Sequence, residues 1–168
     1  PGDTDDARGI AFASLRLGDH ARARAAFDHV CASVPDDAQA WYGAGVACAA
    51  AGDPEAALER LTRCLSVDPA FAAARLRAGR LLAELGRCRQ AVEMLEPLGG
   101  LPEAEALAGD CHERLGAPES AAAAWLRAIA SLREDTEADR QRVAELYERL
   151  ARSAWRGGAA ADCARYSS

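Results

Sequence analysis

The sequence contains no lysine, so all 20 of its basic residues are arginine. Aromatic residues make up only 5% of a chain that is 50% hydrophobic, and the apolar mass is mostly alanine, with leucine second. Alanine favours helices and lets them approach closely. Because β-branched residues are few and scattered, a large sheet is disfavoured and closely packed short helices are expected. The absent lysine and the excess of alanine together indicate a GC-rich bacterial genome.

Long hydrophobic runs and an excess of positive charge are also missing. The stretch of lowest polarity, from Ala40 to Gly52, is too short to span a bilayer. The net charge of −6 argues against a nucleic-acid binder, which usually presents a basic face. No secretory signal is recognisable in a chain that begins Pro-Gly without an initiating Met. We therefore expect a cytoplasmic protein with no membrane segment and no nucleic-acid partner.

The six cysteines lack the CxxC pairs that a structural zinc site needs. Cys111 and His112 are adjacent, but neighbours on a helix point about 100° apart and rarely share one metal. A disulfide framework suits small, loop-rich secreted folds, which this composition does not resemble. We predict that the cysteines are small buried packing residues, and that the chain holds no metal and no cofactor.

Glycines that follow apolar helical segments recur at intervals of 34, 34 and 30 residues. They are Gly18, Gly52, Gly86 and Gly116. A helix often ends in a left-handed residue, and glycine adopts that conformation at the least cost. Asp53 before Pro54, and Pro118 after the last of these glycines, are signals of a helix start. Each unit is therefore predicted to be a helix, a tight glycine turn and a second helix.

The second unit, counted from Ala38, carries the fullest pattern of large and small residues. It comprises Trp41, Ala44, Gly45, Gly52, Ala57, Leu61, Cys64 and Pro69. This pattern resembles a tetratricopeptide repeat, in which small residues let two helices touch and large ones fill the gap to the next hairpin. Cys48 departs from it, because the family usually has tyrosine there.

The resemblance implies an all-α fold, a right-handed α-solenoid of antiparallel helix pairs that forms a superhelix. The hairpins are predicted at residues 4–37, 38–71, 72–101 and 102–135. The third is shortened, because Pro97 breaks its second helix and Gly99-Gly100 form a turn. Hairpins of this kind bury their apolar faces only by stacking on one another.

Residues 136–168 leave two interpretations open. Thr136 can cap a long helix that closes the end of the array, with Glu145–Arg149 and Glu148–Arg152 as ion pairs in the favourable i,i+4 order. Its apolar stripe would be Val143, Leu146, Tyr147, Leu150 and Ala154. The alternative is a degenerate, truncated fifth repeat. That frame uses Tyr147, Leu150, Ala151, Gly158 and Cys163.

In the family, first helices line a concave groove that binds peptides. The corresponding residues here are Arg8, Phe12, Arg16, Gln39, Tyr42, Val46, Leu76, Arg77, Arg80 and Glu84. Arginines beside exposed aromatic rings suit a peptide with carboxylates and apolar anchors. Phe12 and Tyr42 have the alternative of packing between neighbouring first helices. The fourth unit adds Glu103, Asp110, Glu113 and Arg114, so the predicted groove turns acidic at its C-terminal end.

Some family members bind the C-terminal carboxylate of chaperones with a set of basic residues and asparagines. At the corresponding positions here, Arg8 and Arg77 are basic but both asparagines are missing, which argues against a chaperone C-terminus as the ligand. No nucleophile or carboxylate pattern surrounds His20, His29 or His112, so no enzyme activity is predicted. We expect a protein-interaction module or scaffold that binds another protein or a peptide segment. The alternative is a substrate-presenting repeat domain of a larger glycosyltransferase, sulfotransferase or hydroxylase. Self-association through the open solenoid ends is a further hypothesis.

Overall fold

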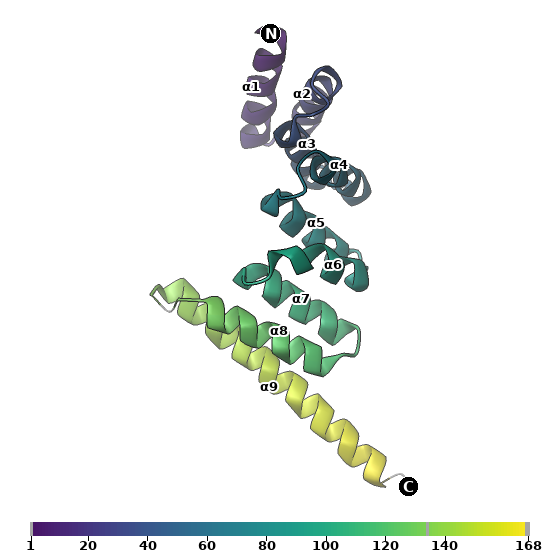
Figure 1. Ribbon diagram of the computed structural model, residues 1–168, viewed down its shortest axis with the longest axis vertical. Helices are drawn as coiled ribbons and strands as arrows, with labels where there is room; N and C mark the ends of the chain where they lie inside the picture. The colour runs from purple at the N-terminus through teal and green to yellow at the C-terminus, as the bar shows by residue number, and fades with distance from the viewer. Residues whose placement is uncertain (1, 134, 167–168) are drawn as a thin grey trace. The chain divides into compact units, whose positions relative to one another are not determined.

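The computed structural model describes the backbone of residues 2–133 and 135–166, and the side chains of residues 4–133 and 135–156. Within these ranges the chain is helical, without strands (Figure 1). The helices are α1 (Gly2–Leu17), α2 (His20–Ser33), α3 (Ala38–Ala50), α4 (Pro54–Val67), α5 (Ala72–Glu84), α6 (Cys88–Leu95), α7 (Pro102–Arg114), α8 (Pro118–Ser131) and α9 (Glu137–Tyr166). The predicted fold class, an all-α solenoid of antiparallel helix pairs, is confirmed. In the described part of the chain, no helix combines the length and apolar character that crossing a membrane requires.

The chain forms two compact units, with the border between Leu81 and Leu82 inside α5. In the N-terminal unit, α1 pairs with α2, α3 pairs with α4, and α2 also packs against α3. In the C-terminal unit, α7 pairs with α8, while α6 packs on α7 and α9 packs on α8. The repeat borders drawn from the sequence remain a prediction.

The glycine turns are built as the sequence predicts. Gly52 has φ +81°, the left-handed conformation, and the amide of Asp53 donates to the carbonyl of Cys48 at 3.0 Å. Asp53 then starts α4, because its side chain accepts a hydrogen bond from the amide of Ala56. The same six-residue hydrogen bond closes the other three turns. It joins Asp19 to Ser14, Arg87 to Leu82 and Ala117 to His112.

Small residues allow the close helix approach that the repeat pattern predicts. A Cβ atom on Gly45 would lie 2.9 Å from the side chain of Leu61, and one on Gly109 would lie 2.4 Å from the ring of Trp125. These two glycines therefore hold equivalent places in the α3–α4 and α7–α8 pairs. Gly43 does the same between α2 and α3, since a Cβ there would lie 2.4 Å from Phe27, which is fully buried.

The cysteines are packing residues, as predicted. The five whose side chains are described are free and buried: Cys31, Cys48, Cys64, Cys88 and Cys111. Burial raises the pKa of the Cys31 and Cys64 thiols to about 11, and burial beside Cys88 raises the pKa of Cys111 to about 12. Neutral thiols are poor nucleophiles and poor metal ligands, so these side chains behave as apolar groups. Cys163 lies outside the described side chains.

Helix α6 ends early at Leu95, and Pro97 lies in the short 3₁₀ helix Glu96–Leu98 that follows it, as the sequence predicts. At the other end of the C-terminal unit, the hydroxyl of Thr136 accepts a hydrogen bond from the amide of Asp139 at 3.1 Å and thereby caps α9. Helix α9 then continues without a turn through Gly158 to Tyr166. This backbone has the long helix of the first interpretation, and its role as a cap remains a prediction.

The predicted apolar stripe of α9 is only partly correct. Val143 and Leu146 are buried, but Tyr147 is 55% exposed and Ala154 is also exposed. The buried face turns instead toward Ser153, which is 5% exposed. The predicted Glu148–Arg152 pair is present at 3.6 Å, whereas Arg149 binds Asp110 of α7.

Candidate polypeptide-binding site

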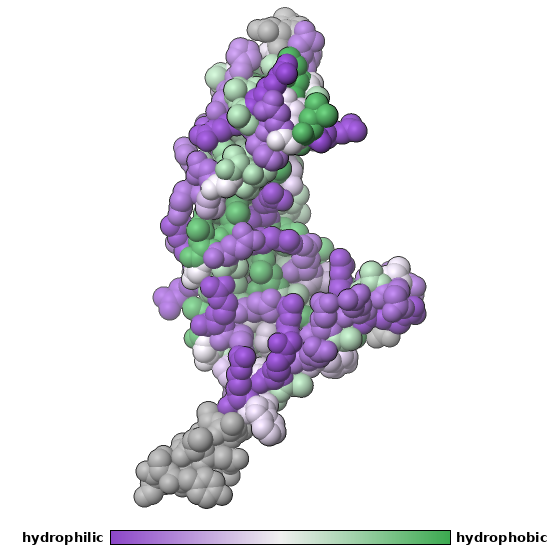
Figure 2. All heavy atoms as spheres, turned by 180° about the vertical axis from the view of Figure 1, so that it is seen from behind, coloured by the Kyte–Doolittle hydropathy of each residue, from purple (hydrophilic) through white to green (hydrophobic). Residues whose placement is uncertain are grey.

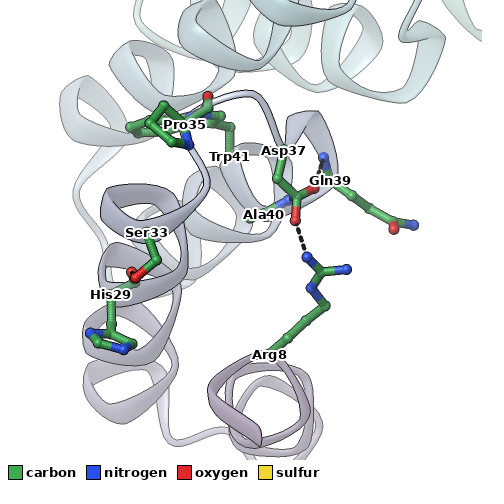
Figure 3. Close-up of polar contacts among 8 residues, drawn as sticks. All are labelled: Arg8, His29, Ser33, Pro35, Asp37, Gln39, Ala40 and Trp41. Carbon is green, nitrogen blue, oxygen red and sulfur yellow. Dashed lines mark hydrogen bonds and ion pairs between the residues drawn. The ribbon is translucent and has the colours of Figure 1, made fainter. Parts of the chain in front are cut away.

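In the N-terminal unit, Arg8 is held by an ion pair. Its guanidinium donates to Asp37 at 2.5 Å, and Figure 3 shows the two side chains meeting between α1 and the start of α3. The other oxygen of Asp37 accepts the amides of Gln39 and Ala40 at 3.0 and 3.1 Å, which caps α3. Asp37 therefore fixes the start of α3 and places Arg8 beside Gln39. The charge of Arg8 is compensated within the chain, which the sequence pattern did not indicate.

The rings of Phe12 and Tyr42 are both packed and partly open. Phe12 contacts Phe27 edge-to-face, with ring centroids 5.1 Å apart, and remains 38% exposed. Tyr42 stacks on Phe71 with centroids 5.2 Å apart and is half-buried. Their partners come from α2 and from the turn before α5, whereas the packing alternative placed them between first helices. Each ring is thus fixed by another ring while it keeps an accessible surface.

The other predicted groove residues differ in exposure. Arg16 and Gln39 are exposed and Val46 is half-buried. On α5, Leu76 and Arg77 are half-buried, while Arg80 and Glu84 are exposed. Glu84 lies past Leu81 and therefore belongs to the C-terminal unit. The membership of all ten residues in one binding surface remains a prediction.

A second feature of the N-terminal unit was missed from sequence. The guanidiniums of Arg60 and Arg63, on α4, lie 5.6 and 5.9 Å from the centroid of the Trp41 ring. The indole Nε1 donates to the carbonyl of Pro35 at 2.7 Å, which fixes the ring. A hollow of about 410 Å³ lies beside these groups. The only sequence signal for this cluster is the i,i+3 spacing of the two arginines. The family pattern assigns the groove to first helices, and both arginines lie on a second helix.

In the C-terminal unit, α9 lies along the acidic residues of α7. Arg149 donates to both oxygens of Asp110 at 2.8 and 2.7 Å, and Trp125 Nε1 donates to the same carboxylate at 3.1 Å. Glu113 accepts from the hydroxyl of Ser153 at 2.7 Å. It also accepts from Arg156 at 3.3 Å. Two of the three acidic residues predicted for the groove in the fourth unit, Asp110 and Glu113, are therefore neutralised by α9.

These residues surround a hollow of about 380 Å³, which we call the arginine hollow. Its lining consists of Arg114, Arg149, Arg152 and Arg156 together with Asp110, Glu113 and Trp125. Four positive groups face two negative ones, so the expectation of an acidic surface is wrong for Asp110 and Glu113, while for Glu103 it remains a prediction. The error has a physical reason: the basic side chains come mostly from α9, which the repeat pattern did not place against α7. Hydrophilic side chains also gather around the turn between α8 and α9 on the face seen in Figure 2.

A buried carboxylate lies elsewhere in the same unit. Glu105 is 8% exposed and accepts hydrogen bonds from Arg127 Nε at 3.0 Å and from the amide of Gly100 at 3.3 Å. Burial by itself raises the pKa of this carboxyl, but the hydrogen bonds and the charge of Arg127 outweigh it and lower the pKa below its usual 4.5. Glu105 is therefore ionised at neutral pH and fixes the turn at Gly100 to α7 and α8.

The paired helices, the glycine turns and the small residues at the helix contacts define a helical-repeat protein. Two profiles described as tetratricopeptide repeat match the chain, one at residues 9–63 and the other at residues 48–100. The chain belongs to the tetratricopeptide repeat family. Proteins of this family are interaction scaffolds that bind other proteins or peptides.

Solved structures share this fold at low sequence identity. MamA (residues 41 to the end) from Desulfovibrio magneticus RS-1 has a TM-score of 0.77 and 19% identity, over 99% of this chain and 97% of that one. TTC0263 of Thermus thermophilus, a thermophilic protein of the family, has a TM-score of 0.62 and 22% identity over 86% and 78%. YrrB, described as having an unusual peptide-binding site, has a TM-score of 0.74 and 17% identity over 86% and 74%. No curated protein sequence matches the chain.

Proposed function

We propose that this protein is a non-catalytic interaction module that binds a polypeptide segment on the first helices of its N-terminal unit. The observation that carries the proposal is the pair of aromatic rings, Phe12 and Tyr42, each held by another ring and each still accessible. Aromatic side chains are the commonest anchors of protein interfaces. A ring already fixed in place loses little conformational entropy when a partner covers it.

The charged residues near these rings define the ligand class. Arg16 is exposed on the same helix as Phe12, and Gln39 is exposed on the helix of Tyr42. On α5, Leu76, Arg77 and Arg80 extend the proposed surface within the N-terminal unit. A segment with an apolar anchor for the rings and carboxylates for the arginines fits this surface best. A cytoplasmic location is part of this proposal, and it agrees with the free state of the five cysteines whose side chains the structure describes.

Selection of binding peptides from a displayed random library, with the whole chain as bait, tests the proposal. We expect the selected peptides to contain aromatic or aliphatic anchors flanked by Asp or Glu. Their affinity for the double variant Phe12→Ala/Tyr42→Ala, measured by calorimetry, should fall about tenfold or more, because each anchor is worth about 1–2 kcal/mol.

Two further variants keep this test decisive. Leu17→Ala/Val34→Ala removes exposed apolar side chains from the same unit, with exposed fractions of 85% and 39%, and should leave the affinity within about twofold. Arg16→Glu reverses an exposed charge without touching the core and should weaken binding of the acidic peptides. Unchanged affinity in both Phe12→Ala/Tyr42→Ala and Arg16→Glu would exclude this surface as the binding site.

A further inference from the structure

The arginine hollow of the C-terminal unit has the charge of an anion site on an acidic protein. Its lining has four guanidiniums and two carboxylates, although the whole chain has a net charge of −6. The side chains of Arg152 and Arg156 are 66% and 71% exposed, so both are accessible to a ligand. A local positive field in a concave surface concentrates anions there, even where the overall charge would repel them.

The residues that hold α9 in place differ from those that remain accessible. Arg149 forms a bidentate ion pair with Asp110, and Ser153 donates a hydrogen bond to Glu113. These contacts fix α9 in place. Arg152 and Arg156 follow Arg149 by three and seven residues and therefore share its helix face. The ligand-facing arginines thus stand on a backbone that other residues have already positioned.

Arg152 and Arg156 also keep hydrogen-bond donors for a ligand. A guanidinium has five N–H donors in a planar fork. Among the described residues, Arg156 donates only through Nη1, to Glu113 at 3.3 Å. Arg152 donates through Nε to the carbonyl of Glu148, and its Nη2 lies 3.6 Å from the carboxylate of the same residue. Each contact is long and exposed, so a ligand can replace it at little cost.

We propose that the arginine hollow binds the side-chain carboxylates of an acidic polypeptide segment, with Arg152 and Arg156 as the contacting residues. The arginines of the hollow already bind carboxylates of this chain, which shows that the geometry suits that group. This second site uses residues of the C-terminal unit alone, so it does not depend on Phe12 or Tyr42.

Fluorescence anisotropy with the whole chain and a labelled octaglutamate peptide tests the proposal. The peptide is amidated at its C-terminus, so that only side-chain carboxylates are present. We expect Arg152→Ala/Arg156→Ala to weaken binding about tenfold or more. The matched control, Arg140→Ala/Arg142→Ala, removes the same charge from exposed sites of the same helix and should change affinity by about twofold at most.

Equal losses in the two double variants would overturn the proposal, because binding would then follow net charge. Failure of octaglutamate to bind, or binding of a phosphoserine peptide alone, would overturn the carboxylate assignment. Failure here is distinct from failure of the proposed function. Octaglutamate binding should survive Phe12→Ala/Tyr42→Ala, and the library-selected anchor peptides should still bind Arg152→Ala/Arg156→Ala.

Discussion

The two units present chemically different surfaces on the same kind of helix. In the N-terminal unit, aromatic rings on α1 and α3 are held by other rings and remain partly open. In the C-terminal unit, carboxylates on α7 are neutralised by Arg149 and Arg156 of α9. The comparison shows that a position assigned to a groove by the repeat pattern is not thereby available to a ligand. The element that packs beside a first helix decides whether its polar residues are free.

The two units also share a structural feature, an ion pair that starts from a first helix. Each contains an ion pair that joins a first helix to an element later in the chain, Arg8 with Asp37 in one and Asp110 with Arg149 in the other. In both cases the carboxylate also accepts other hydrogen bonds, from the amides at the start of α3 or from Trp125. A carboxylate that accepts several hydrogen bonds is held in one orientation. These ion pairs therefore fix the positions of the helices that they join.

The largest expected effect is the loss of stability when a Cβ atom is added to a glycine that packs against a large aromatic ring. Gly43→Ala forces a Cβ against Phe27, and Gly109→Ala forces one against Trp125, each at 2.4 Å before relaxation. We expect each to lower the free energy of unfolding by about 1–3 kcal/mol. Gly43→Ala should cost more, because Phe27 is fully buried, whereas Trp125, 3% exposed, borders the arginine hollow. Urea unfolding followed by circular dichroism measures both.

Gly9→Ala is the control for this comparison. A Cβ at Gly9 meets nothing within 4 Å, so the change should stabilise α1 by about 0.5–1 kcal/mol through helix propensity. A loss in Gly9→Ala similar to that in Gly43→Ala would show that ring contact is not the cause.

The second prediction separates the two roles of Asp37. Asp37→Ala removes both the α3 cap and the Arg8 pair, and should cost about 1–2 kcal/mol. Asp37→Asn keeps a capping oxygen but no charge, and should cost less than half as much, because asparagine caps helices as well as aspartate does. Arg8→Ala removes only the ion pair. If Arg8→Ala lowered the free energy of unfolding in urea by as much as Asp37→Ala does, the cap would contribute nothing to stability.

The smallest expected effect is a pH dependence confined to the C-terminal unit. Glu105 occupies the repeat position that Trp41 has in the second hairpin, and the pKa of its carboxyl is lowered below 4.5 in the folded state. The ionised carboxyl therefore stabilises the fold above about pH 4.5, and this contribution is lost as the pH falls through the lower, folded pKa.

We expect the urea midpoint of Glu105→Gln to vary less between pH 3 and 6 than that of the parent protein. The matched control is Glu119→Gln, which changes an exposed carboxylate in the first turn of α8. If Glu105→Gln and Glu119→Gln show the same pH profile, the Arg127 contact does not govern the titration.

Much of the fold could be predicted from the sequence because its causes are local. The left-handed glycines, the caps at Asp53 and Thr136, and the early end of α6 at Pro97 each follow from the preference of one or two residues. The closeness of Gly45 to Leu61 follows from the repeat pattern, since a small residue faces a large one at fixed spacing.

The candidate sites could be predicted only in part. Phe12 and Tyr42 were identified from their positions, but their ring partners Phe27 and Phe71 were not. The arginine hollow was missed, because Arg149 was assigned to Glu145 on its own helix and instead binds Asp110, 39 residues earlier. Local spacing favours an i,i+4 pair by only about 0.3–0.5 kcal/mol, so packing of α9 readily overrides it.

The sequence by itself determined the family, the helix–turn–helix units and the burial of the five described cysteines, because glycine turns, helix periodicity and small-residue spacing act over a few residues. The tertiary structure alone decided which charged side chains meet across helices, and hence that Asp110 and Glu113 of α7 became part of a basic hollow. Electrostatic character depends on the sum of charges within a few ångströms in space. Separation along the sequence does not predict that sum, because only the packing of the helices brings distant charges together.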